Sequence, residues 1–123
     1  MEMNRRGAEG PVISGFSGRG FKVDGGVYEG LLISPERADG WAPPALDALS
    51  EGDLAALLAL DPKPEFLLLG TGSMMRRPPL ALVKMLEARG IGLEAMDSRA
   101  AARAWGVLRA ELRWIGAALY PLD

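Results

Sequence analysis

The 123-residue sequence contains no cysteine and no histidine. The missing thiols exclude disulfide bonds, thiolate metal sites and a cysteine nucleophile. The missing imidazoles exclude a Ser-His-Asp triad, the usual zinc sites and the side chain that most often acts as a general base near neutral pH. The sequence therefore argues against an enzyme, and we expect a protein that holds neither a metal ion nor a cofactor.

Long apolar runs and an excess of basic charge are also missing. No stretch reaches the ~18 apolar residues that a membrane-spanning helix needs. Fourteen Lys and Arg stand against sixteen Asp and Glu, whereas nucleic-acid-binding proteins usually carry a basic surface. The first ten residues are polar and lead into no apolar segment, unlike a secretory signal. We therefore expect a cytoplasmic protein that neither enters a membrane nor binds nucleic acid.

Length and composition favour one folded domain. Apolar residues make up 49% of the chain and charged residues 24%, which is ordinary for a globular protein. A single domain typically spans ~100–200 residues, and one of this size buries roughly two-thirds of its unfolded surface. We expect residues 1–10 to form a disordered N-terminus and residues 11–123 to form a single α/β domain.

Turn residues divide the first third of the chain into short strands. Val12–Phe16 is a short, partly apolar stretch that predicts a strand. The Asp-Gly-Gly sequence at 24–26 permits positive φ between Phe21–Val23 and Val27–Ile33, and it predicts a β-hairpin. Ser34–Pro44 contains three prolines and a glycine, which predict a loop.

The rest of the chain alternates between helices and strands. Ser50 followed by Asp53 is typical of a capping box, Pro78 is typical of a helix start, and Asp97 or Ser98 is a helix N-cap. We expect helices over about 50–60, 78–90 and 98–112, and strands over 65–69, 91–96 and 114–120. This alternation favours an α/β fold with a mixed or mainly parallel sheet and helices on its faces.

Two strand ends could bind a ligand, because ligands in open α/β sheets lie beyond the carboxyl ends of the strands. The first end continues into Thr71, Gly72 and Ser73, where backbone amides could hold an anion, with Arg76 nearby as a cation. Met75 replaces the third glycine of a dinucleotide-binding motif, and the lysine of a P-loop is missing. The alternative is a turn that requires glycine, followed by solvated arginines.

The second candidate end belongs to the strand predicted at 91–96. Alternation places Glu94 and Met96 on the same face. In a central strand, the carboxylate of Glu94 would lie in an apolar layer, where it must be paired or change its pKa. Such a group is a functional candidate, and Arg113 is its possible partner. The alternatives are a structural ion pair or a glutamate at an exposed strand edge.

Aromatic and methionine side chains suggest a partner surface. Tyr28 lies in the predicted hairpin and Trp41 in the proline-rich loop, and exposed aromatic residues often mark interfaces. A loop tryptophan also often folds back against the edge of the core. Met74 and Met75 could form an adaptable binding edge or a lid over the core.

Several stretches match a known family in order and spacing. They are Phe21–Ile33, Trp41, Pro62–Gly72, Gly90–Ala101 and Ala110–Leu119. Together they resemble a small family of largely uncharacterised proteins that includes the mitochondrial factor for respiratory complex I assembly and the adipogenesis-associated protein of animals. The resemblance covers residues 12–122.

The resemblance implies a three-layer α/β fold around a central mixed sheet, whose last strand runs antiparallel to its neighbours. It implies no established enzymatic activity and no cofactor, and its mitochondrial members act as assembly factors through protein contacts. Because the chain begins without a presequence, we expect a bacterial protein.

The chain departs from the family pattern at two positions. Family members commonly carry an asparagine where this chain has Gly106, and a glycine where it has Leu112. A glycine within a helix costs about 1 kcal/mol relative to alanine, which suggests either tight packing at Gly106 or simple tolerance. The candidate site residues that match the family pattern are Thr71, Gly72, Glu94, Met96 and Arg113.

Three hypotheses about function follow. The leading one is a non-enzymatic protein-interaction or assembly factor with a link to respiratory complex I biogenesis, acting with a protein partner as a monomer or homodimer. The second is a small-molecule or anion-binding module with its pocket at the two strand ends. The third is an enzyme, which would need Glu94 as its acid or base.

Overall fold

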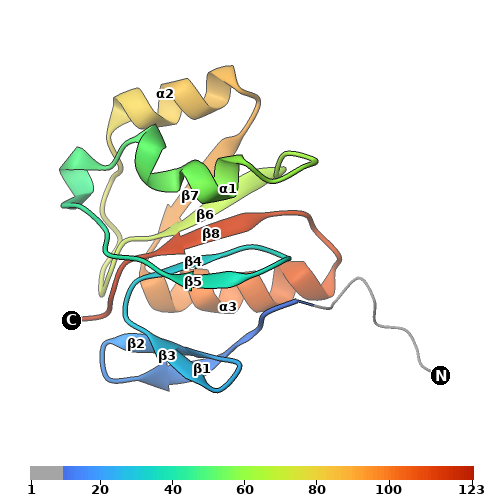
Figure 1. Cartoon of the computed structure of the whole chain (residues 1–123). Helices are drawn as coiled ribbons and strands as arrows, with labels where there is room; N and C mark the ends of the chain where they lie inside the picture. The colour runs from blue at the N-terminus through green and yellow to red at the C-terminus, as the bar shows by residue number, and fades with distance from the viewer. Residues whose placement is uncertain (1–9) are drawn as a thin grey trace.

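The structure, a computed structural model, describes residues 10–123. The expected disordered segment at residues 1–10 lies outside the described residues, apart from Gly10. A small antiparallel sheet consists of β1 (Ile13–Ser17), β2 (Gly20–Val23) and β3 (Gly26–Tyr28). The central sheet has the order β5 (Ala38–Gly40), β4 (Leu31–Ile33), β8 (Gly116–Leu119), β6 (Phe66–Gly70) and β7 (Gly92–Met96) (Figure 1).

The predicted hairpin is present, but its second strand is divided between the two sheets. β2 and β3 pair across a turn in which Asp24 and Gly25 have φ of +48° and +88°. The chain then bends at Gly30, and β4 joins the central sheet. A Cβ at Gly30 would overlap the carbonyl oxygen of Trp41, while the backbone N–H of Trp41 donates to the carbonyl of Gly30 at 2.9 Å. This close approach requires glycine and accounts for the break.

The sequence predicts a loop over residues 34–44, and this prediction is wrong at Ala38–Gly40, which form strand β5. The Ser34 hydroxyl accepts hydrogen bonds from the backbone N–H groups of Glu36 and Arg37, at 3.1 and 3.2 Å. The resulting tight turn lets β5 pair antiparallel with β4. Pro35 lies inside the turn and the other two prolines follow the strand, so none of them occupies a position in β5.

The last strand lies in the middle of the central sheet and has two kinds of neighbour. β8 is antiparallel to β4 and parallel to β6, which is itself parallel to β7. The expected mixed sheet is confirmed, but the implied antiparallel arrangement of the last strand is correct for only one neighbour. Because helices connect β6 to β7 and β7 to β8, these three strands can run in the same direction.

Helices cover both faces of the central sheet and produce the expected three layers (Figure 1). α3 (Ser98–Ala110) packs on one face together with the small sheet, where Trp105 is fully buried. α2 (Leu80–Ala88) and the single turn α1 (Ala55–Leu58) pack on the other face. Two short 3-10 helices, η2 (Leu46–Ala48) and η3 (Glu51–Leu54), precede α1.

The capping box and the Asp97 cap are present as predicted, but the helix start predicted at Pro78 is wrong, because α2 begins at Leu80 with Pro79 as its N-cap. The N–H of Ser50 donates to the Asp53 carboxylate at 2.9 Å, and the Asp97 carboxylate accepts from the N–H of Ala100 at 2.9 Å. Gly90 follows α2 with φ of +79°. The helix expected at 50–60 is shorter than predicted, because η3 takes its first turn and only α1 is α-helical.

Gly106 is exposed on α3, and an added Cβ would meet no atom within 4 Å. The glycine is therefore tolerated rather than required by packing. Gly70 is the opposite case, because its Cβ would lie 2.7 Å from Leu119 Cδ2 and 2.9 Å from Ser98 Cα.

These two glycines predict opposite effects of the same substitution. Gly106→Ala should raise the free energy of unfolding by about 0.5–1 kcal/mol, because alanine restricts the unfolded chain and favours the helix. Gly70→Ala should lower it by about 1–3 kcal/mol through overpacking. Urea denaturation of both variants measures the difference, and a destabilised Gly106→Ala variant would contradict the assignment.

Candidate functional site

The carboxyl ends of β6 and β7 form the place where a ligand is expected. The chain leaves β6 toward α2 on one face of the sheet and leaves β7 toward α3 on the other. Adjacent parallel strands with such diverging connections create the crevice that binds ligands in many α/β proteins. The predicted residues Thr71, Gly72 and Ser73 lie directly after β6 at this point.

The buried side chain of Ser98 occupies this crevice and hydrogen-bonds the chain segments around it. The Ser98 side chain is fully buried at the start of α3. Its hydroxyl accepts from the N–H of Gly72 at 2.8 Å and donates to the carbonyl of Tyr120 at 2.8 Å. The N–H of Ser98 donates to the carbonyl of Gly72, also at 2.8 Å. One residue thus connects the ends of β6 and β8 with the start of α3.

Thr71 organises the loop that follows β6. Its hydroxyl accepts from the N–H of Arg76 at 3.0 Å and lies 2.7 Å from the carbonyl of Met74, to which it donates. The Thr71 N–H donates to the carbonyl of Met96 at 2.9 Å. The structure therefore brings together Thr71, Gly72 and Met96, which the sequence placed at one end of the sheet.

The loop's polar groups are largely used by the protein itself. The N–H groups of Gly72 and Arg76 donate to side-chain hydroxyls, and the Ser73 hydroxyl accepts from the N–H of Asp123 at 3.0 Å. Gly72 has φ of +102°, which side chains rarely adopt. These observations favour the turn that requires glycine over a phosphate-binding loop.

The predicted pairing of Glu94 with Arg113 is wrong. β7 is an edge strand and Glu94 is exposed, so its carboxylate does not lie in an apolar layer. Arg113 instead forms an ion pair with Glu65 at 2.7 Å. The hydrogen bond from Arg113, followed by one from the backbone of Trp114, lowers the pKa of Glu65 below its ordinary value. Glu94 therefore matches the alternative of a glutamate at an exposed strand edge, because β7 pairs with only one other strand, β6.

The aromatic candidates are half-buried. Trp41 folds back onto Tyr120 in an edge-to-face contact with ring centroids 5.3 Å apart. Tyr28 packs against the core on the α3 side. Met74 and Met75 are 66% and 53% exposed, so they do not form a lid over the core.

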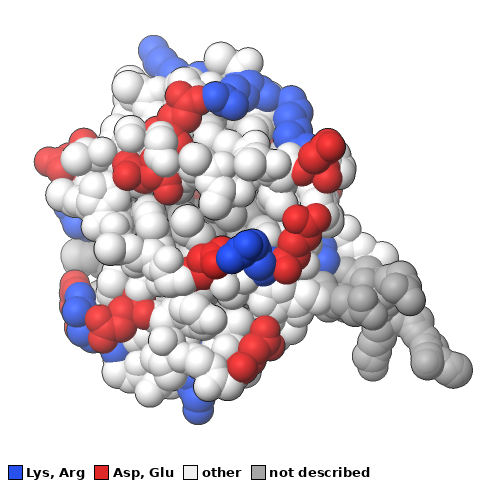
Figure 2. Space-filling model, viewed as in Figure 1, with Lys and Arg blue, Asp and Glu red and all other residues white. Residues whose placement is uncertain are grey.

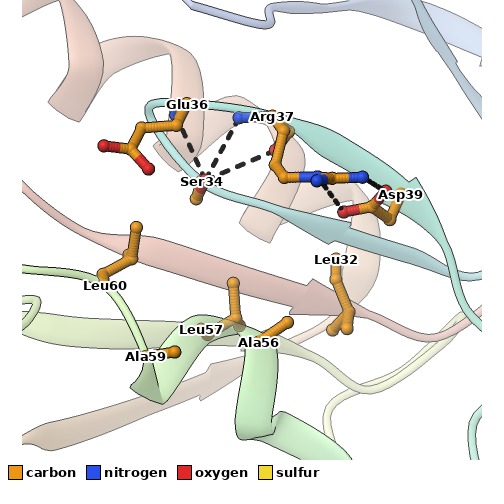
Figure 3. A pocket seen from close by; sticks show the side chains of 9 residues that line it. All are labelled: Leu32, Ser34, Glu36, Arg37, Asp39, Ala56, Leu57, Ala59 and Leu60. Atoms are coloured by element: carbon orange, nitrogen blue, oxygen red, sulfur yellow. Dashed lines mark hydrogen bonds and ion pairs between the residues drawn. The ribbon is translucent and has the colours of Figure 1, made fainter.

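A small hollow of about 180 Å³ lies between the β4–β5 hairpin and α1. Leu32 and Leu57 are among the apolar residues that line it, and the Arg37 guanidinium bonds the Asp39 carboxylate with oxygen–nitrogen distances of 2.7 and 2.8 Å (Figure 3). The Arg37–Asp39 pair offsets its own charges, which leaves the carboxylate of Glu36 as the remaining charge of the lining.

Three further observations concern possible metal sites, membrane spans and the charge of one face. Residues 10–123 contain no group of three or more Asp and Glu side chains that could hold a metal ion. None of the helices within this range has the length and apolar character to cross a membrane. The face shown in Figure 2 intersperses acidic and basic side chains without a continuous basic stripe.

Tyr120 is a residue that sequence reasoning missed. Within residues 10–123, its hydroxyl is the only buried side-chain nitrogen or oxygen without a hydrogen-bond partner. Burial is the main cause that raises the pKa of Tyr120 to about 12, with Asp53 adding to it. Ser98 was considered only as a possible helix cap. The hydrogen bonds of Ser98 and the burial of the Tyr120 hydroxyl leave no local sequence signal, because both depend on segments that are far apart in the chain.

Comparison with known sequences agrees with the resemblance. Residues 13–120 match the family described as Protein of unknown function (DUF498/DUF598). An uncharacterised protein of Rhodobacter capsulatus is 39% identical over 111 residues, covering 89% of this chain and 84% of that protein. NADH dehydrogenase (ubiquinone) 1 alpha subcomplex assembly factor 3 of Danio rerio is 31% identical over 120 residues, covering 97% of this chain and 69% of that protein.

Solved structures confirm the fold. A crystal structure of a Bordetella parapertussis protein has a TM-score of 0.80 and 30% identity, covering 92% of this chain and 97% of that chain. A Bartonella henselae protein named as an outer membrane protein has a TM-score of 0.82 and 26% identity, covering 94% and 98%.

The Ser98 network predicts a strong effect of removing one oxygen atom. Ser98→Ala should lower the free energy of unfolding by about 1–3 kcal/mol, because the N–H of Gly72 loses its acceptor in a buried place. Ser73→Ala, at the exposed end of the same loop, should change it by less than about 0.5 kcal/mol. Urea denaturation compares the two, and equal effects would show that the buried network does not stabilise the fold.

For Tyr120 we expect the opposite of the Ser98 result, namely a gain in stability when the side-chain oxygen is removed. Tyr120→Phe should raise the free energy of unfolding by about 1 kcal/mol at neutral pH, because it removes an unpaired buried hydroxyl. With a folded pKa of about 12 against an ordinary value of 10.0, the wild type should lose stability as the pH rises from 10 toward 12. The variant should lack this loss. Denaturation midpoints across this pH range test both statements, and a destabilised variant would contradict them.

Proposed function

The chain belongs to the DUF498/DUF598 family of proteins of unknown function, and from this premise we propose that it is a non-enzymatic assembly factor for respiratory complex I. The observation that carries the proposal is the similarity to the zebrafish protein, which is named as an assembly factor for NADH dehydrogenase and matches nearly the whole chain. A similarity over this length supports a shared mode of action, namely protein contacts.

The candidate site at the ends of β6 and β7 favours a protein that acts through protein contacts over a small-molecule pocket or a catalytic centre. The crevice at the end of β6 and β7 is occupied by Thr71 and Ser98, whose hydroxyls accept from the N–H groups of Arg76 and Gly72. Glu94 is exposed, and Arg113, its predicted partner, pairs with Glu65 instead. The alternative of a small-molecule module with its pocket at Thr71, Gly72, Ser73 and Glu94 is correspondingly weaker.

The proposal includes a location and a partner. We propose that the protein acts in the cytoplasm on a complex I subunit or an assembly intermediate, as a monomer or homodimer. The similarity to a protein named as an outer membrane protein makes the location a direct experimental question, which cell fractionation of the tagged protein answers.

The proposal predicts a defined partner in cells. The tagged full-length chain, purified gently from the organism that carries it, should enrich NADH dehydrogenase subunits in quantitative mass spectrometry, whereas an unrelated tagged protein should not. Deletion of its gene should reduce fully assembled complex I on native gels while subunits accumulate in smaller species. Expression of the wild-type chain should restore assembly. Normal assembly in the deletion strain, with no enriched subunit, would contradict the proposed function.

A further inference from the structure

An open depression of about 610 Å³ lies beside the filled crevice, at the carboxyl end of β8. The proline-containing segment 42–46 and Pro121 supply most of its apolar lining. Its charged residues are Arg19, Arg76 and Asp47. Asp53 also acts on the lining residue Tyr120, whose pKa it helps to raise. The case for an acidic occupant therefore depends on the guanidinium groups, above all that of Arg76, because guanidinium groups are well suited to bind carboxylates.

Arg76 is held in place through its backbone while its charge stays available. Its N–H donates to the hydroxyl of buried Thr71 at 3.0 Å. The Arg76 side chain is exposed, and its guanidinium forms no ion pair with any other residue in the range 10–123. Arg19 is also anchored, because its Nε donates to the carbonyl of Leu122 at 3.0 Å. An exposed pair with Glu29, at 3.5 Å, only weakly neutralises it.

Tyr120 adds an unused polar group to the same depression. It lines the depression, and its hydroxyl is buried without a partner. A buried hydroxyl without a hydrogen bond is costly to keep in the free protein. A tyrosine hydroxyl can donate a hydrogen bond to a carboxylate, so this group is available to an acidic occupant.

The loop that supplies Arg76 also presents apolar side chains. Met74 and Met75 directly precede it and are 66% and 53% exposed. Flexible methionine side chains suit surfaces that contact other proteins. Met74 and Met75 do not line the depression itself, but they belong to the same loop as Arg76. An open depression with exposed methionines on an adjoining loop fits a polypeptide segment better than a small anion.

We propose that this depression docks a segment of the protein partner in which Asp or Glu stands next to apolar side chains. The carboxylate pairs with the guanidinium of Arg76 and accepts from the Tyr120 hydroxyl, while the apolar side chains contact Met74 and Met75. The inference rests on the proposed function, because it requires a protein partner, and it adds the chemistry of the contact.

Photo-crosslinking in cells tests the docking surface. A benzophenone amino acid replaces Met74 in the full chain, and in a matched control it replaces Val107, which is 59% exposed on α3. Mass spectrometry of the crosslinked peptides should identify a partner segment with Asp or Glu beside apolar residues at Met74 and not at Val107. In the Met74 probe, Arg76→Ala should lower the crosslink yield about tenfold, whereas Arg77→Ala, outside the depression, should leave most of it.

Each outcome separates the inference from the proposed function. If the wild-type chain enriches NADH dehydrogenase subunits but Arg76→Ala and Arg77→Ala crosslink equally, the docking surface is wrong and the proposed function stands. A crosslinked segment without acidic residues, or crosslinks from Val107 alone, likewise overturns it. If the wild-type chain enriches no partner, the proposed function and this inference both fail.

Tyr120→Phe distinguishes a binding role from a structural one. In the docking arrangement, this variant should have a higher denaturation midpoint than the wild type and yet a several-fold lower crosslink yield from the Met74 probe. A residue that only supports the fold would show no loss of crosslinking once the folded fraction is equal. An unchanged yield would remove Tyr120 from the docking surface.

Discussion

The buried hydroxyl of Ser98 is the interaction on which the carboxyl end of the central sheet depends. It accepts from Gly72 and donates to Tyr120, so it joins two neighbouring strands to the first turn of α3. Its position requires a glycine at residue 70, because a side chain there would collide with Ser98. A hydroxyl that satisfies a buried N–H contributes more than an exposed one, since the alternative is an unpaired donor in a dry place. The small residues at the end of β6 follow from this constraint.

The same network decides which functions the fold can perform at this position. The crevice between diverging parallel strands is the usual ligand site of such sheets, yet here Thr71 and Ser98 occupy it and pair the N–H groups of Arg76 and Gly72. The loop after β6 therefore carries its cation and its methionines outward, beyond the crevice. A surface that contacts other proteins fits this arrangement, as it fits a family whose named relatives assemble a larger complex.

The sequence was sufficient for features that depend on neighbouring residues. The Asp-Gly-Gly turn, the Asp97 cap and the Ser50–Asp53 box all appear in the structure, because turn and cap preferences act within a few residues. Features that depend on distant segments were missed. β5 forms because a hydroxyl builds a tight turn among prolines. The position of β7 at the edge, which exposes Glu94 and leaves Arg113 to Glu65, is set by strand order, which no local pattern encodes.

Closure of the crevice and presentation of a binding surface are two consequences of one loop conformation. The Thr71 hydroxyl that helps fill the crevice also fixes the backbone of Arg76. The Tyr120 carbonyl accepts a hydrogen bond from Ser98, and the hydroxyl of the same tyrosine has no partner among the described residues. A cation fixed through its backbone loses less conformational freedom on binding than one on a mobile loop. The internal hydrogen bonds that remove a small-molecule site thereby preorganise a surface for a larger partner. Among the buried side-chain nitrogen and oxygen atoms of residues 10–123, the Tyr120 hydroxyl is the one that this network leaves without a partner.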